Sequence, residues 1–200
     1  MLRSGIGLEP DYPIATARLL LRPLALSDAD ELLSYHSLES VHRYLPMGPF
    51  DRDVIVERIS VGPWAKTTLA QEGDAMCLGL ENRATGQLVG DVMLRWHSEK
   101  HGQGEIGYVL HPDHAGLGYA TEASQALLQL AFDGLGLHRV TANIWPDNEP
   151  SLGVVRRLGM REEAHHVESV RGGEGWTDLL VFALLEREWR AQSGPAEPRA

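Results

Sequence analysis

Two glycines, Gly116 and Gly118, stand just ahead of an expected helix and suggest the chemistry of this chain. The segment from 104 to 121 reads GEIGYVLHPDHAGLGYAT, which predicts a strand, a glycine-containing turn and the first turn of a helix. The first N–H groups of a helix have no partner within it, and with the helix macrodipole they bind phosphate well. Glycines let the backbone approach that phosphate without a Cβ in the way. The segment therefore predicts a site for a pyrophosphate-bearing cofactor.

Other phosphate-binding glycine loops fit this segment poorly. A P-loop ends in Gly-Lys-Ser or Gly-Lys-Thr, and no such tripeptide follows either glycine. A dinucleotide fingerprint has a third glycine, where this chain has Thr121, and it lies near the start of a βαβ unit rather than in the second half of a chain. On the loop alone, a turn that binds no ligand remains an open alternative.

Length and composition are those of one soluble globular domain. The chain has 200 residues, 43% of them hydrophobic, and a formal net charge of −10. That charge argues against non-specific nucleic-acid binding and is compatible with a cationic partner such as an amine. The lone cysteine, Cys77, lies in an apolar run and is expected to be buried rather than reactive. No apolar run has the roughly 18 residues of a membrane span, so we expect a cytoplasmic protein without membrane partners.

The elements that position the glycine loop follow from periodicity and turn residues. After a flexible leader at 1–15, a single domain is expected at 16–190, and a disordered tail at 191–200. Ser27 is expected to cap the first helix, and 41–49 to form a loop. The order of strands and helices predicts an α+β (mixed α/β) domain around a mostly antiparallel sheet. Strands are expected at 16–24, 76–81, 87–96, 104–110, 139–145, 161–170 and 177–185, and helices at 27–35, 51–66, 119–132 and 151–158.

The run from 104 to 158 resembles the GNAT superfamily of acetyl-CoA-dependent N-acetyltransferases. The family signature is (Arg/Gln)-x-x-Gly-x-(Gly/Ala), and Gly118-Tyr119-Ala120 supplies its end. The longer form GLGYATEA at 116–123 is similar to the RimJ/RimL branch, as are RLLLRP at 18–23, EIGY at 105–108 and NEPS at 148–151. One departure is the Arg/Gln position, which falls on Ala115 or His114. It changes little, because backbone amides bind the pyrophosphate.

This resemblance, which covers about 16–189, implies a fold, a cofactor and a partner. The implied fold is GNAT-like, with a splayed strand pair in the central sheet and flanking helices. The implied cofactor is acetyl-CoA, and the acceptor is a primary amine, either a protein N-terminus or a small molecule. Members of the branch often form homodimers. Two rival functions stay open: a CoA-binding module without catalysis, and a nicotinamide-dependent dehydrogenase.

The resemblance also implies which residues meet the cofactor. A backbone N–H of Val109 or Leu110 would face the thioester carbonyl. Asn148 would hydrogen-bond the pantetheine arm, cap the short helix, or do both. The expected cofactor contacts are Tyr108, Val109, Leu110, Ala115, Gly116, Leu117, Gly118, Tyr119, Ala120, Thr121, Asn148 and Ser151.

Acetyl transfer to an amine also needs a base and favours an acid. Glu105 is the first candidate base, because it lies on the strand that borders the thioester, and Asp91 is the second. Strand alternation places Glu105, Gly107 and Val109 on one face. The resemblance implies Ser151 as the general acid, in place of the tyrosine that many members use. Two alternatives stay open: Glu105 could be an ordinary solvated glutamate at a strand end, and Ser151 an ordinary serine in the first turn of a helix. His97, His101, His111 and His114 are expected in loops without metal-ligand spacing, so no metal is predicted.

Overall fold

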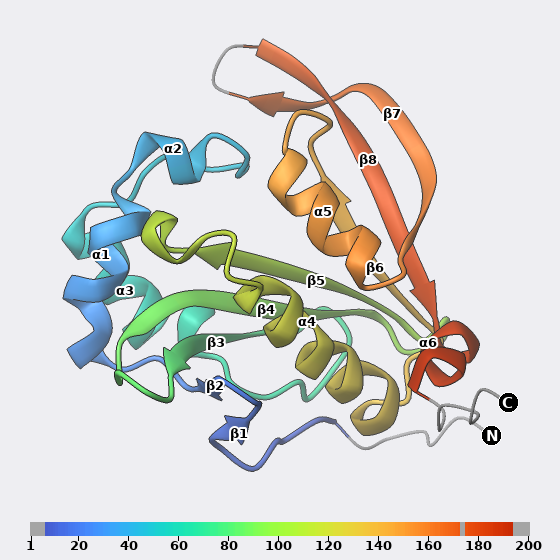
Figure 1. The fold of residues 1–200 in the computed structure, drawn as a ribbon, viewed down its shortest axis with the longest axis horizontal. Helices are drawn as coiled ribbons and strands as arrows, with labels where there is room; N and C mark the ends of the chain where they lie inside the picture. Colours follow the sequence, from blue (N-terminus) through green and yellow to red (C-terminus); the bar gives the residue numbers. More distant parts are fainter. Residues whose placement is uncertain (1–6, 173–174, 194–200) are drawn as a thin grey trace, which may run out of the picture.

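A computed structural model describes residues 7–172 and 175–193, and it contains one eight-stranded sheet (Figure 1). The strand order is β1-β2-β3-β4-β5-β6-β8-β7. Every described neighbour pair is antiparallel except β5 and β6, which run parallel. This confirms the predicted mixed, mostly antiparallel sheet. The strands are β1 (Ile14–Ala15), β2 (Leu19–Arg22), β3 (Ala75–Asn82), β4 (Leu88–Ser98), β5 (Gln103–Leu110), β6 (Arg139–Ile144), β7 (Arg161–Gly172) and β8 (Gly175–Leu185).

Helices cover both faces of this sheet. One face carries α4 and α5, whose apolar side chains form a large core with Leu78, Leu94 and Ile106 of the sheet. The other face carries α1 and α3, which pack with Cys77, Met93 and Val109. The helices are α1 (Ala29–His36), α2 (Glu39–His42), α3 (Arg52–Ser60), α4 (Tyr119–Gln129), α5 (Glu149–Arg157) and α6 (Glu186–Ser193). The last turn of α4 continues as a π-helical turn, Leu130–Gly134.

The parallel pair β5 and β6 separates soon after it begins. The two strands pair only over Gln103 with Arg139, Gly104 with Val140, and Glu105 with Thr141. Beyond Glu105 each strand keeps its outer partner, β4 for β5 and β8 for β6. Figure 1 shows the two strands leaving a common corner in diverging directions. The predicted splayed pair is confirmed, and it leaves one edge of β5 open from 106 to 110.

Three local predictions need correction. Residues 7–15 are not a free leader, because Leu8 is buried and exchanges backbone hydrogen bonds with Leu69, and Ile14–Ala15 join the sheet. Residues 191–193 of the expected tail belong to α6, while 1–6 and 194–200 lie outside the described residues. Ser27 does not cap α1, since a 3₁₀ turn at Leu26–Asp28 precedes it.

The segment expected as a loop at 41–49 begins inside the short helix α2. A four-residue helix has too few turns to show a periodicity in sequence. The helix expected at 51–66 ends at Ser60, and α6 was not expected. The strands from β3 to β8 begin and end within a few residues of the predicted bounds, and residues 173–174 of the closing hairpin lie outside the described residues.

Candidate active site

The open edge of β5 presents backbone groups of its even-numbered residues. The N–H of His111 donates to Val89 of β4, and the carbonyl of Val109 approaches Gly90 so closely that a Cβ there would lie 2.3 Å away. Backbone groups alternate in direction along a strand, so odd-numbered residues of β5 face β4. Thr141 of β6 donates to the carbonyl of Gly104, which places the even-numbered residues on the opposite edge. Tyr108 and Leu110 therefore present their amides to the opening.

This direction decides between the two amides expected to meet a thioester. The Val109 amide is turned to β4, and its side chain packs against the α1–α3 core. The Val109 amide therefore faces away from the opening, whereas the amides of Tyr108 and Leu110 face it. Side chains alternate as predicted: Ile106, Tyr108 and Leu110 lie in or against the core that includes α4.

The glycine loop that follows β5 has the conformation its sequence predicts. Gly116 has φ +77° and Gly118 has φ +84°, both in the left-handed region that favours glycine. Gly118 is the N-cap of α4, and the first α-helical bond runs from the N–H of Glu122 to the Gly118 carbonyl. The N–H groups of residues 119–121 precede that bond and have no acceptor inside the helix. A Cβ at Gly116 would meet no atom within 4 Å, so the loop has open space for a ligand.

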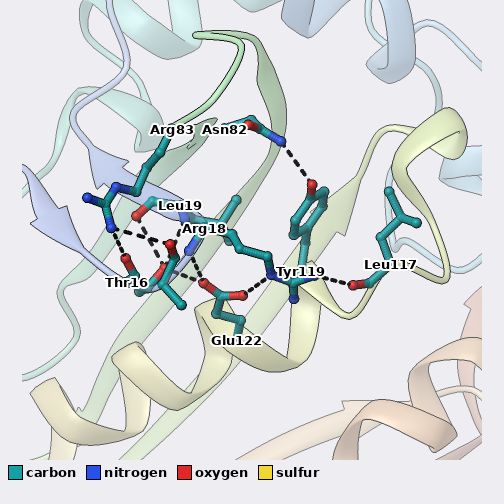
Figure 2. A network of polar contacts seen from close by, with 9 residues as sticks. Thr16, Arg18, Leu19, Asn82, Arg83, Leu117, Tyr119 and Glu122 are labelled. Carbon is teal, nitrogen blue, oxygen red and sulfur yellow. Dashed lines mark hydrogen bonds and ion pairs between the residues drawn. The ribbon is translucent and has the colours of Figure 1, made fainter.

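Arg18, at the start of β2, holds this loop from one side (Figure 2). Its Nη1 donates to the carbonyl of Leu117 at 2.8 Å, and its Nε donates to Glu122 of α4 at 2.7 Å. Carbonyl and N–H point in opposite directions across a trans peptide. Because the Leu117 carbonyl faces Arg18, the N–H of Gly118 points away from it. Arg18 thus fixes the peptide that presents one of the expected phosphate donors.

Glu122 completes this clamp of Arg18 and Glu122. Its carboxylate also accepts from the Thr16 hydroxyl at 2.6 Å and from the Arg18 backbone N–H at 2.7 Å. Partial burial acts to raise the pKa of Glu122, but these hydrogen bonds outweigh it and leave that pKa below its usual value. The Arg18 guanidinium lies 4.8 Å from the centre of the Tyr119 ring, whose hydroxyl accepts from Asn82. The network ties α4 to β2 and β3 (Figure 2).

Three of the loop residues contribute through the backbone alone. The side chains of Tyr119 and Ala120 are buried in the core. The Thr121 hydroxyl is also buried, and it has no hydrogen-bond partner among the described residues. The expected contacts of these residues with a cofactor are therefore those of their N–H groups.

The N-terminus of α5 lies across the opening from β5. The Asn148 side chain accepts from the N–H of Ser151 at 3.2 Å, so its predicted capping role is confirmed. The Tyr108 hydroxyl donates to the backbone carbonyl of Ser151, also at 3.2 Å. Burial raises the pKa of Tyr108 to about 12, so the hydroxyl stays protonated at neutral pH. The structure thus brings Tyr108, Asn148 and Ser151 together, as a single site requires.

Glu105 lies at the closed end of the opening. It forms the last parallel pair, with Thr141, before the strands separate. Its Oε2 is 2.7 Å from Nε2 of His97. His97 was expected in a loop, but β4 extends to Ser98 through an irregularity between Trp96 and Ser98, which keeps the histidine beside β5. Glu105 therefore faces the opposite side of the sheet from α5 and Ser151.

Asp91 is a buried structural group. Its Oδ2 accepts from the Tyr35 hydroxyl at 2.9 Å and lies 2.8 Å from Nε2 of His36. His36 in turn lies 3.4 Å from His42, and the His42 ring lies 2.9 Å from the Met47 carbonyl. Asp91 is 7% exposed, so its carboxylate already has partners and little access to an acceptor. Of the two candidate carboxylates, Glu105 is the more exposed to solvent.

One rim of the opening joins α2 to the loop after β6. The Tyr44 hydroxyl donates to the carbonyl of Asp147 at 3.2 Å, and its ring meets Trp145 edge-on. From the other side, a Cβ at Gly172 of the hairpin would lie 2.9 Å from Trp145. Tyr44 and Gly172 therefore meet the residues after β6 from two sides, beside the opening.

Residues 18–161 match the family model of the acetyltransferase (GNAT) domain, which is of the RimJ/RimL type. The chain belongs to the GNAT family of N-acetyltransferases. It is 32% identical over 179 residues to the uncharacterized N-acetyltransferase YnaD of Bacillus subtilis (strain 168), covering 88% of this chain and 98% of that protein. The expected enzyme class is therefore confirmed.

Solved structures of GNAT acetyltransferases share this fold. A GNAT-family acetyltransferase from Bacillus anthracis superposes with a TM-score of 0.76 at 27% identity, covering 92% of this chain and all of that one. Spermidine N-acetyltransferase from Vibrio cholerae, solved with CoA and spermine, has a TM-score of 0.71 at 19% identity, covering 87% and 99%. Within the described ranges, no helix combines the length and the apolar character that crossing a membrane requires.

The residues present fit the acetyl-CoA that GNAT enzymes use. Free amides at the α4 N-terminus suit a diphosphate, and the open β5 edge suits a linear amide-containing arm. Sequence reasoning missed the clamp of Arg18 and Glu122, although both residues lie in motifs of the family resemblance. Their contact spans more than a hundred positions, so only the fold brings them together.

Proposed function

We propose that this GNAT enzyme transfers an acetyl group from acetyl-CoA to a primary amine by direct attack of the amine on the thioester. One observation carries the proposal: β5 and β6 separate between the N-terminus of α4, whose first amides have no acceptor in the helix, and the carboxylate of Glu105. The cofactor face holds α4 and α5, and the opposite face holds Glu105. The opening lets an amine from one face reach an acetyl group held from the other.

The binding roles follow from the directions of the donors. The amides of residues 117–121 would hold the diphosphate, with Ala115 and Gly116 leading the chain around it. The edge amides of Tyr108 and Leu110 would pair with the pantetheine arm, and Asn148 and Ser151 would close over it from α5. The clamp of Arg18 and Glu122 supports these roles, because it fixes the loop before any ligand arrives.

Acetyl-CoA supplies a thioester carbonyl that a neutral amine can attack. Glu105 takes the proton from the amine, directly or through water. An α-amine, with a pKa of about 8, needs little help near neutral pH, whereas a lysine amine at about 10.4 needs more. An edge amide, with Leu110 as our candidate, donates to the carbonyl oxygen as negative charge develops. Such a donor is worth roughly 2.7–4 kcal/mol in other enzymes. Ser151 gives its hydroxyl proton to the departing sulfur and takes a proton back from water, so that CoA leaves as the thiol and the serine is restored.

The acceptor that we propose is a protein N-terminal α-amine or a small cationic amine. The RimJ/RimL type of the family supports the first. The net charge of −10 favours a cationic acceptor, and a 24% identical relative over 110 residues is the spermidine N(1)-acetyltransferase of Vibrio cholerae. A homodimer remains part of the proposal by family resemblance.

A thiol-release assay tests this function. The protein would be mixed with acetyl-CoA and one of three amines: a lysine-free peptide with a free N-terminus, a matched peptide with a blocked N-terminus and one lysine, and spermidine. We expect CoA release with at least one of them. Glu105→Gln should lower kcat roughly 10²–10⁴-fold while CoA binds as before.

Other results would favour the rival functions. Tight CoA binding with no amine-dependent thiol release over a wide amine panel would indicate a binding module. Thermal stabilisation by a nicotinamide dinucleotide, with none by CoA, would indicate a dehydrogenase.

A further inference from the structure

His97 connects the candidate base to solvent. Its Nε2 lies 2.7 Å from Oε2 of Glu105, and the two side chains are 42% and 21% exposed. The carboxylate is therefore the more shielded member and the imidazole the wetter one. Both project from neighbouring strands on the sheet face opposite α4 and α5. A proton that leaves the shielded carboxylate has an imidazole directly in hydrogen-bond reach.

We propose that His97 is the proton outlet and positioning residue of Glu105, an inference that rests on the proposed function. Glu105 removes one proton from the amine and becomes a neutral carboxylic acid. It then passes that proton to Nε2 of neutral His97 in its Nδ1–H tautomer. The resulting imidazolium releases the Nδ1 proton to water, and exchange with water moves the remaining proton from Nε2 back to Nδ1. Each cycle restores the carboxylate and the neutral imidazole, and the proton formed with the amide reaches solvent.

The surroundings of the pair leave this role to His97. Arg95 lies directly opposite Glu105 in the β4–β5 register and is permanently charged, so it cannot carry protons. Thr141 faces Glu105 from β6 and has no titratable group near neutral pH. Three charged side chains on neighbouring segments have partners of their own: Arg139 pairs with Glu163, Lys66 pairs with Asp74, and Glu72 accepts from the N–H of Glu99.

An ordinary surface ion pair would predict little effect on turnover. Exposed pairs contribute at most about 1 kcal/mol to stability, and their loss leaves chemistry untouched. If His97 carries the proton away from Glu105, its replacement should instead lower kcat by an amount that depends on pH. The pair must pass on the proton that it has taken before the carboxylate can accept the next one.

The test measures kcat against pH at saturating acetyl-CoA and amine. The wild-type kcat should depend on pH, because each turnover passes one proton from the carboxylate through the imidazole to water. In His97→Gln we expect kcat to be roughly ten- to hundredfold lower at neutral pH, with a pH profile that differs from that of the wild type. Free imidazole should restore turnover to His97→Ala but not to Glu105→Gln.

His101→Gln is the matched control, since His101 is an exposed histidine in the adjoining turn. We expect its kcat and pH profile to equal those of the wild type. A His97→Gln enzyme with the profile of His101→Gln would overturn the outlet. If Glu105→Gln itself kept full activity, the proposed base would fail instead, so the two failures are distinguishable. CoA affinity, measured for every variant, reports whether the fold is intact.

Discussion

The hydroxyl of Tyr108 on β5 donates a hydrogen bond to the backbone carbonyl of Ser151 on α5, at 3.2 Å. The bond joins the strand on one side of the opening to the helix that follows the strand on the other side. The glycine loop before α4 follows β5 directly, so β5 and this loop have a fixed relative position. The hydrogen bond adds α5 to this unit and so fixes α5 relative to a pantetheine arm that would lie between β5 and α5. The position of α5 relative to β5 therefore depends in part on the Tyr108 hydroxyl.

Tyr108→Phe should remove the hydrogen bond between β5 and α5. Loss of one partly buried hydrogen bond lowers the free energy of unfolding by about 1 kcal/mol, and KM for acetyl-CoA should rise. Urea unfolding and steady-state kinetics measure the two effects. Tyr44→Phe is the control, because the Tyr44 hydroxyl makes a bond of equal length to Asp147 on the other rim. It should leave KM for acetyl-CoA unchanged, and equal effects of both variants on that KM would refute the assignment.

Ser151→Ala should lower kcat by roughly tenfold if the serine protonates the leaving sulfur. The loss should be modest, because a thiol has a pKa near 8.5 and its thiolate can leave unaided. The helix should remain, since Asn148 caps it through the Ser151 backbone N–H rather than the hydroxyl. Single-turnover rates at several pH values separate the chemical step from release of CoA. An unchanged chemical step across the pH range would remove Ser151 from the mechanism.

Arg18→Ala should weaken acetyl-CoA binding by roughly tenfold, because charge-assisted hydrogen bonds of about 1.5–3 kcal/mol orient the loop. Glu122→Gln should have a similar effect, and the double variant should be no worse than the sum of the two. Calorimetric titration with CoA measures the change. Arg52→Ala removes a surface ion pair with Asp30 and serves as the control. Unaltered CoA affinity in both Arg18→Ala and Glu122→Gln would contradict a role for the clamp.

The contribution of Glu122 to the stability of the fold depends on pH. The pKa of Glu122 is lower in the folded protein than in the unfolded chain, so the unfolded chain binds the proton more readily. The stability from Glu122 is therefore complete above the unfolded pKa of about 4.3 and is lost as the pH falls through the lower folded value.

Gly118→Ala tests the backbone rather than the side chains. At φ +84° an L-residue pays roughly 1–2 kcal/mol, and the new Cβ would lie 3.4 Å from Nη2 of Arg18. We expect lower stability and weaker CoA binding. Gly153→Ala, inside α5 with only ordinary contacts at its Cβ, should instead raise stability by roughly 0.5–1 kcal/mol. Equal melting temperatures for the two variants would show that the left-handed turn is not required.

Local pattern carried most of the fold. Alternation assigned the faces of β5 correctly, and the glycine pair located the start of α4 at Tyr119, because both depend on residues that are close in sequence. The open edge of β5 came from family resemblance, since no local signal tells where two parallel strands cease to pair. The β5–β6 register that defines it became visible only in the structure.

The hydrogen bonds that position the site could not be predicted from local sequence pattern, because they join residues that are far apart in the chain. Arg18 meets Glu122, and Tyr108 meets Ser151, across large sequence separations. His97 was expected in a loop, only one residue beyond the predicted end of the strand that pairs with β5. An irregularity of one residue near Trp96 carries β4 past its expected end, and such bulges have no reliable sequence signature without a glycine.

The buried histidines behind Asp91 give stability its own pH dependence. Burial is the main reason that the pKa of His42 is lowered, with the nearby His36 and Arg58 acting in the same direction. The unfolded chain therefore binds a proton at His42 more readily than the folded protein does. The stability that depends on neutral His42 is complete above the unfolded pKa of about 6.5 and declines as the pH falls towards the lower folded value. Carboxylates such as Asp74 and Glu122, whose pKa values are lowered, act only in a more acidic range. Urea unfolding between about pH 7.5 and 5.5 should thus show a falling free energy for the wild type and a flatter curve for His42→Gln. A slope that persists unchanged in that variant would place the titrating group elsewhere.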